Sequence, residues 1–207
     1  MSSASAIGFD FSALGPRERY KLMIGTIVPR PIALVTTVDE AGRVNAAPFS
    51  FFNCLSADPP ILAIGVETNP DMSLKDTGEN IRRTEVFTVN IVSVAIAEAM
   101  HVCAARYPRG VDELAEAGLT ACPGVKIAAP YIAEAPAAFE CRRTLTLELG
   151  KSRQIILGEI VQAHYQPGIV DPDTLRVNPA ALDAIARLGG DTCATIRDRF
   201  EMLTPKL

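Results

Sequence analysis

The stretch from Asn45 to Ser56 mixes flat apolar side chains with small polar ones. It reads NAAPFSFFNCLS, and its candidate ligand-binding residues are Asn45, Ser50, Phe51, Asn53 and Ser56. Hydroxyl and amide groups beside aromatic rings suit a planar heteroaromatic ligand whose edge carries hydrogen-bond donors and acceptors. The alternative is that the phenylalanines belong to a core and the polar residues form turns. The stretch by itself favours neither interpretation.

A second candidate lies at Lys75, Asp76 and Thr77. Asp76 is followed three residues later by Glu79, a pattern that predicts a capped helix start. Backbone N–H groups and the helix dipole at such a start favour an anion such as a phosphate. The competing interpretation is that Asp76 and Glu79 already occupy the helix end, which leaves Lys75 as a solvated charge.

Arg30 is a third candidate, because Pro29 and Pro31 hold it in an extended segment. It can supply a second positive charge to an anion, or it can form a surface ion pair.

The motifs of several enzyme classes are missing from the sequence. It contains no GxGxxG, no Walker lysine motif, no GxSxG, no CxxC and no HExxH. The two histidines, His101 and His164, are far apart in the chain, so a zinc site is not expected and each histidine is better explained as a structural or surface residue. No catalytic side chain can be named, and a bound cofactor would have to supply demanding chemistry.

The composition is that of one globular domain of 207 residues. Apolar residues make up 48% of the chain, and 24 acidic against 20 basic residues give a net charge of −4. A mildly acidic chain without a basic cluster is not expected to bind nucleic acid. The five cysteines form no disulfide framework, and no secretory or membrane-spanning segment is recognised, so we expect a cytoplasmic protein.

The elements that must position these candidates are mostly strands. Residues 1–15 are expected to be a flexible leader, and 16–207 one domain that begins with a short helix from Pro16 to Gly25. Strands are predicted at 32–38 and from 44 onward as a hairpin, and then at 53–56, 61–67, 86–92, 145–149 and 155–164, with Gly158 as a bulge or a barrel bend. Helices are predicted at 95–105 and 111–117. The pattern favours a mainly β fold with flanking helices, a closed or half-closed barrel.

Four segments stand in a characteristic order and spacing. They are VPRPIALVTTVDEAGRVNAAPFSFFNCLSADPP from Val28, SLKDTGENIRRTEVFTVNIV from Ser73, GVDELAEAGLT from Gly110 and FECRRTLTLELGKSRQIILGEIV from Phe139. Together they resemble the flavin reductase-like, FMN-binding split-barrel family, to which flavoredoxin belongs. The resemblance implies a split β-barrel, a homodimer with flavin near the subunit interface, non-covalent FMN and a nicotinamide nucleotide as reductant.

The same resemblance implies roles for the candidate residues. The Asn45–Ser56 stretch lies along the isoalloxazine ring and ribityl chain in relatives, and Lys75, Asp76 and Thr77 match the segment that approaches the phosphate, with Arg30 as a second positive charge. Some flavoredoxin-like members place a histidine in the hairpin loop that here reads Gly150-Lys-Ser-Arg153, and this sequence lacks it. The resemblance fades after His164.

Three hypotheses follow. The first is an NAD(P)H-dependent flavin oxidoreductase that uses FMN, with FAD as the alternative flavin, and passes electrons to free flavin, oxygen or a partner such as an oxygenase. The second is a non-catalytic flavin or cofactor binder, a carrier, store or sensor on the same barrel. The third is a flavin-free redox protein that uses Cys54. A homodimer is expected because apolar segments such as 86–92 need cover.

Overall fold

A computed structural model describes residues 6–205 of the chain. Residues 1–5 of the expected leader lie outside the described range, and its remaining residues, 6–15, form neither helix nor strand. The first helix, α1 (Pro16–Thr26), follows directly. It begins at a proline, as predicted, and runs one residue past Gly25, because the N–H of Ile27 bonds back to the carbonyl of Met23.

One antiparallel sheet of seven strands dominates the structure. In order across the sheet the strands are β3 (Val44–Phe49), β2 (Ala33–Val38), β6 (Val86–Ile91), β9 (Ala137–Leu149), β10 (Arg153–Tyr165), β5 (Pro60–Glu67) and β4 (Phe52–Ala57). The two edge strands, β3 and β4, are joined by only Ser50 and Phe51, so the sheet must curl until its edges meet. At the start of β4, the N–H of Gly65 on β5 donates to the carbonyl of Phe51 at 2.7 Å and extends the β4–β5 pairing by one residue. The predicted split barrel is confirmed.

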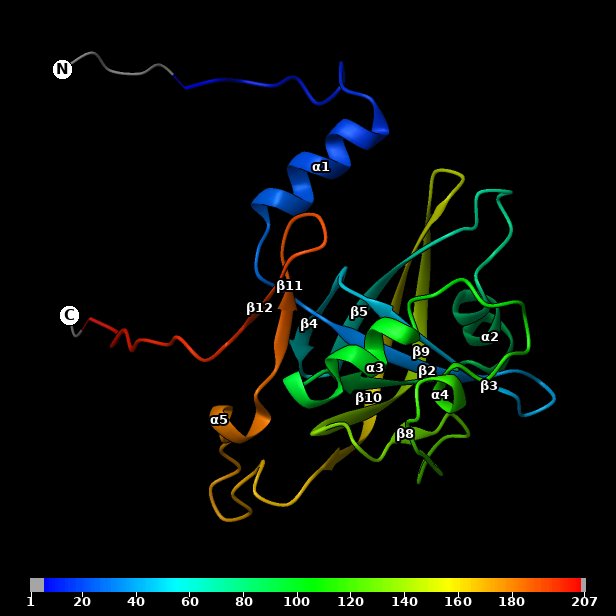
Figure 1. The fold of residues 1–207 in the computed structure, drawn as a ribbon, viewed down its shortest axis with the longest axis vertical. Helices are drawn as coiled ribbons and strands as arrows, with labels where there is room; N and C mark the ends of the chain where they lie inside the picture. Colours follow the sequence, from blue (N-terminus) through cyan, green and yellow to red (C-terminus); the bar gives the residue numbers. More distant parts are fainter. Residues whose placement is uncertain (1–5, 206–207) are drawn as a thin grey trace.

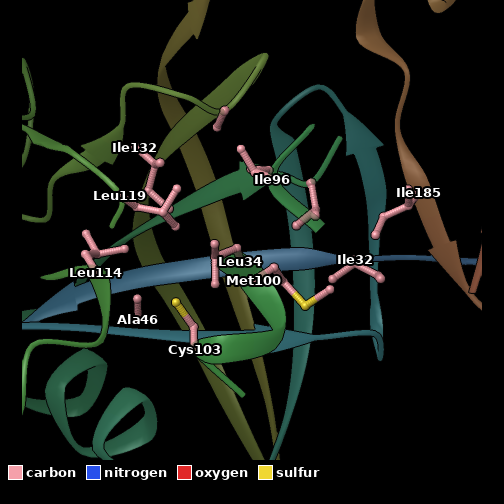
Figure 2. Packing of buried hydrophobic residues seen from close by; sticks show 12 residues of the cluster. Ile32, Leu34, Ala46, Ile96, Met100, Cys103, Leu114, Leu119, Ile132 and Ile185 are labelled. Carbon is pink, nitrogen blue, oxygen red and sulfur yellow. The ribbon is translucent and has the colours of Figure 1, made fainter. Parts of the chain in front are cut away.

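Strand β2 is buried along its whole length because it has a core on each face. Ala33 and Val35 point into the barrel with Phe87 and Val89, whereas Leu34 points outward. Outside, Leu34 is covered by Met100 of the short helix α3 (Ala97–Val102) and by Cys103 directly after it, as Figure 2 shows. This two-sided burial explains why the β2 sequence is a continuous apolar and Thr run.

The helices beside β2 are shorter than the sequence predicts. The 95–105 segment divides into a 3₁₀ turn, η1 (Val94–Ile96), and α3, and the 111–117 segment contains only α4 (Glu113–Glu116). Asp112 caps α4 by accepting hydrogen bonds from the N–H groups of Leu114 and Ala115, so the helix begins after it.

Helix α2 (Asp76–Thr84) closes one end of the barrel. Its Ile81 is fully buried in the barrel core, and Asn80 donates its Nδ2 to Thr37 Oγ1 at 3.0 Å. These two contacts fix the helix against the end of β2, so the residues at its start are held in a defined place.

The long strands β9 and β10 form a hairpin that reaches beyond the barrel (Figure 1). A bulge is found opposite Gly158, where the register shifts and leaves Thr144 of β9 as the extra residue; a Cβ at Gly158 would stand 2.4 Å from the ring of Phe87. On the outer face, Leu145, Leu147 and Leu149 are 46%, 43% and 50% exposed. The 86–92 segment, by contrast, is almost wholly buried because β6 is a central strand, so the cover expected for it comes from this chain itself.

The remaining elements lie at the periphery. They are β1 (Arg30–Pro31), β7 (Ala121–Cys122), β8 (Tyr131–Ile132), α5 (Pro179–Leu182), β11 (Ile185–Arg187) and β12 (Cys193–Thr195). Strands β1, β11 and β12 form a small sheet, and α1 extends away from the barrel next to it (Figure 1).

Candidate functional site

Two segments that the sequence singled out separately meet in the structure. The amide Nδ2 of Asn45, on β3, donates to the hydroxyl Oγ1 of Thr77, on α2, at 3.1 Å. Both residues are buried, and they are 32 residues apart in the chain. A buried hydrogen bond between side chains of two elements fixes their separation. Asn45 and Thr77 therefore join the candidate ring-binding strand to the candidate anion-binding helix.

The start of α2 differs from the predicted capped helix. The N-cap is Lys75, one residue earlier than the pattern indicated, and no side chain caps it. Glu79 turns away to pair with Arg83 at 2.6 Å, and Asp76 lies 3.7 Å from Arg109. The capping pattern is therefore wrong, for the physical reason that each carboxylate has found an arginine. The N–H groups of the first turn are left without a side-chain acceptor among the described residues.

Strand β4 presents the polar residues of the candidate stretch on one face. Pairing across the sheet places Asn53 opposite Ala63, which is opposite Leu157, which is opposite Leu145. Directly paired residues share a face, so Asn53 lies on the outer face that carries the exposed leucines.

A bulge in β4 brings Ser56 to that same face. With a period of two, residues 53 and 56 would lie on opposite faces. The register shift between Cys54 and Ser56 inserts one residue, so Ser56 pairs with Ile61 on the outer side. Asn53 and Ser56 are both exposed.

The three phenylalanines of the stretch have different positions. Phe49 is buried and Phe52 packs against the barrel core, as the structural interpretation expected. Phe51 is 41% exposed, with Tyr20 of α1 6.3 Å away between ring centroids. Ser50, beside it, is half-buried. A Cβ at Gly65 would stand 3.0 Å from Phe51 Cβ, so the glycine lets this aromatic lie close to the sheet.

Arg30 has a different environment from the one expected of a second phosphate-binding cation. It is 8% exposed, and its guanidinium donates to the carbonyls of Ile24 at 2.7 Å, Ile27 at 2.8 Å and Leu188 at 2.9 Å. These contacts tie the end of α1 to the turn between β11 and β12. Among the described residues, no hydrogen bond joins Arg30 to Lys75 or to the start of α2. The surface ion pair considered for Arg30 is also absent there.

Two residues beside the α2 start carried no role in the sequence interpretation. Arg109 reaches Asp76 from the loop before α4, and Glu113 accepts the N–H of Ala46 at 2.9 Å, directly after Asn45. Burial raises the pKa of the Glu113 carboxyl. The only signals in the sequence were the RYPRG turn and the acidic start of α4, and neither indicates a position beside β3.

His164 takes part in a closed cluster elsewhere. Its Nε2 lies 2.6 Å from Oε1 of the fully buried Glu140, and its ring stacks on Tyr131 with centroids 4.1 Å apart. Glu140 also accepts the N–H groups of Val125, Lys126 and Ile127. The structural interpretation of His164 fits this cluster, whereas His101 is exposed.

Within residues 6–205 no group of three His, Cys, Asp or Glu side chains is placed to hold a metal ion, and no helix there has the length and apolar character needed to cross a membrane. Cys54 is exposed on β4 as a free thiol.

Comparison with known proteins decides the family. The model of the flavin reductase like domain matches residues 24–191. The chain belongs to the flavin reductase-like family. The match extends beyond His164, where the sequence resemblance faded, and it includes β11 with its contact to Arg30. The family makes this chain an oxidoreductase of the flavin reductase type.

Individual relatives agree with this flavin reductase-like assignment. An uncharacterised protein of Deinococcus radiodurans is 40% identical over 94% of the chain and 88% of its own length. The 2-nitrobenzoate 2-nitroreductase of Pseudomonas fluorescens is 35% identical, with a TM-score of 0.87 over 96% of both chains. Component B of nitrilotriacetate monooxygenase from Bacillus cereus is 29% identical, with a TM-score of 0.91 over 97% of this chain and 100% of that one.

Proposed function

We propose that the protein is a flavin reductase that binds FMN and passes hydride from NADH or NADPH to flavin, and electrons from there to an acceptor. The observation that carries this proposal is the Asn45–Thr77 hydrogen bond, which ties the first residue of the candidate ring-binding stretch, on β3, to the uncapped start of α2. A ring-binding strand and an anion-binding helix start are the two parts that a flavin mononucleotide requires.

The residues present fit this cofactor. Lys75 and the free N–H groups of the first turn of α2 would hold the phosphate, with Asp76 and Thr77 fixing that turn. Ser50, Asn53 and Ser56 would supply hydrogen bonds, and Phe51 an apolar surface, to the ring and ribityl chain. When bound, the flavin supplies two-electron redox chemistry. The adenylate of FAD has no further motif in this chain, so FMN is the proposed cofactor and FAD the alternative.

The electron acceptor is proposed only as a class. The Pseudomonas fluorescens relative is a reductase of a small nitroaromatic acid, and the Bacillus cereus relative is one component of a monooxygenase. These two support either a small-molecule acceptor or a partner oxygenase for this chain.

We also propose a homodimer formed through the outer face of the sheet, with residues 16–207 of each copy as a single domain. The exposed leucines of β9 and the candidate β4 residues share that face, so a second copy that covers the leucines would also border the flavin. Light scattering of the flavin-loaded protein should give about twice the 22.1 kDa chain mass. A stable monomer with flavin fully bound would contradict this part of the proposal.

An anaerobic reduction tests the enzyme assignment. The flavin-loaded protein is mixed with excess NADH or NADPH, and the visible flavin absorbance is followed. Rapid bleaching supports a reductase. Tight flavin binding without bleaching by either nucleotide would mean a carrier or sensor, and absence of flavin binding would refute both.

A further inference from the structure

The chain exposes more surface than a compact monomer of its mass. Its accessible surface is 13011 Å², whereas a compact monomer of 22.1 kDa exposes about 9,300 Å². The residues outside the described range account for at most about 1,100 Å² of the difference, which is the surface of a fully extended chain of that length. About 2,600 Å² per chain remains, and obligate interfaces bury about 2,000–5,000 Å² over both partners. The excess is therefore large enough to supply a permanent interface.

Two terminal segments carry exposed apolar side chains. We call residues 6–15 the N-terminal arm and residues 198–205 the C-terminal arm. The exposed side chains are Ile7, Phe9 and Phe11 of the first arm and Phe200, Met202 and Leu203 of the second. Hydrogen bonds of the N-terminal arm stay within it or join it to α1, and the C-terminal arm makes none with any other residue of 6–205. The described part of the chain thus leaves the apolar side chains of both arms in contact with water.

The arms lie outside the part of the chain that the family shares. The model of the flavin reductase like domain matches residues 24–191, and both arms fall beyond these limits. Figure 1 shows that both arms run away from the barrel on the side of the small sheet, and away from the β9–β10 hairpin. An arm therefore does not cover the exposed leucines of its own β9, and apolar segments of this kind mark an interaction with another molecule.

Both arms begin beside the face proposed for the dimer. Strand β1, which follows α1, packs against β4, and the C-terminal arm follows β12 of the same small sheet. On α1, the ring of Tyr20 lies 6.3 Å from that of Phe51, directly before β4. Strand β4 is the edge of the outer face that carries Asn53 and the exposed leucines. A second copy on this face lies within reach, since the eight residues of the C-terminal arm can span up to about 26 Å.

We propose that the two copies of the homodimer exchange their arms, so that Phe9 and Phe11 of each copy pack on the exposed β9 leucines of the other. This inference rests on the homodimer of the proposed function and names the segments that hold it together. Arms and leucines are both apolar and both uncovered within one chain, and a two-fold axis covers both sets at once. Since the leucines share a face with Asn53 and Ser56, the arm of one copy also borders the flavin site of the other.

Sedimentation velocity of the flavin-loaded full chain over a concentration series tests the exchange. Phe9→Ser combined with Phe11→Ser should raise the dissociation constant of the dimer at least about a hundredfold, because both arms lose their buried rings. Circular dichroism should show an intact fold, since both rings are exposed in their own chain. Leu175→Ser, which removes an exposed apolar side chain from the loop after β10, is the control and should change nothing. An unchanged dissociation constant in the double variant, or equal weakening in the control, would overturn the exchange and leave the homodimer standing.

A photo-cross-link locates the arm. With benzoylphenylalanine in place of Phe9, irradiation should join two chains, which gives a product of about twice the 22.1 kDa chain mass under denaturing conditions. Mass spectrometry should place the link in β9 of the other copy. Links within one chain only, a link to a different part of the other copy, or no link would each overturn the proposal. A monomeric parent would contradict the homodimer as well, whereas the anaerobic reduction of bound flavin tests the enzyme assignment separately.

Discussion

Two regions of the molecule place several backbone N–H groups close together. In one region a side chain accepts from these groups, and in the other none does. Around Glu140, three consecutive N–H groups donate to one fully buried carboxylate, and His164 completes the set. At the start of α2 no side chain of residues 6–205 accepts from the first turn, because Glu79 and Asp76 lie against arginines. A saturated cluster holds a loop in place, whereas an unsaturated one is available to an external anion. By this criterion the Glu140 cluster is structural, and the start of α2 is the proposed anion site.

The largest expected effect is the loss of stability when Glu140 is removed from the saturated cluster. Glu140→Ala leaves one buried and two part-buried N–H groups and His164 without their acceptor, so the free energy of unfolding should fall by about 3–5 kcal/mol. Chemical denaturation of the variant measures this loss. The FMN affinity of the folded fraction should stay within about twofold of the parent. A loss of FMN binding without a loss of stability would contradict the structural role of the Glu140 cluster.

Arg30 is held by carbonyls of its own chain through Nη1 and Nη2, with only its Nε unpaired among the described residues, although its sequence context suggested an anion site. Arg30→Met removes three hydrogen bonds to buried or half-buried carbonyls and should cost about 2–3 kcal/mol of stability. Thermal melting checks this effect. The variant should bind FMN as tightly as the parent does, and the same should hold for riboflavin. A loss of affinity for FMN alone would show that Arg30 contacts the phosphate.

The pH dependence sharpens the account of Glu140. Burial raises the pKa of this carboxyl, but the N–H donors and His164 outweigh burial and hold the pKa below the ordinary glutamate value of 4.5. The ionised carboxylate therefore adds stability above the unfolded-state pKa, and that stability is lost as the pH falls through the folded-state pKa. The stability gap between the parent and Glu140→Gln should be constant near neutral pH and should narrow in acid. A gap that widens in acid would show that the carboxyl is protonated in the folded protein.

A smaller effect is expected where the two halves of the candidate site meet. Thr77→Val keeps the shape of the side chain but removes the acceptor of Asn45, which should cost about 1 kcal/mol of stability. Because the helix start then loses its tie to β3, FMN affinity should fall a few-fold. Thr84→Val, at the other end of α2, is the matched control, since its hydroxyl bonds only within the helix. An identical response of FMN affinity in both variants would remove the proposed role of the Asn45–Thr77 contact.

The sequence predicts the order of strands well because alternation and turn residues are local signals. The β2–β3 hairpin, the β4–β5 pair around Asp58-Pro59-Pro60 and the Gly158 bulge all lie where the pattern places them. The site is harder to predict. The position of Ser56 depends on a bulge that no turn residue marks, and the burial of Arg30 depends on Leu188, which is 158 residues away in the chain. The α2 cap shifted because Glu79 and Asp76 found Arg83 and Arg109, and such partner choices are set by tertiary contacts.

The most direct test of the central claim is the effect of Lys75→Ala on the binding of two flavins. If Lys75 and the free N–H groups of α2 hold the phosphate, the variant loses one charge-assisted contact worth about 1.5–3 kcal/mol. Calorimetric titration should then show FMN binding weakened about ten- to a hundredfold, while riboflavin, which lacks the phosphate, binds as before. Equal losses for FMN and riboflavin, or no loss for either, would contradict the account and leave Lys75 as a solvated charge at the start of the helix.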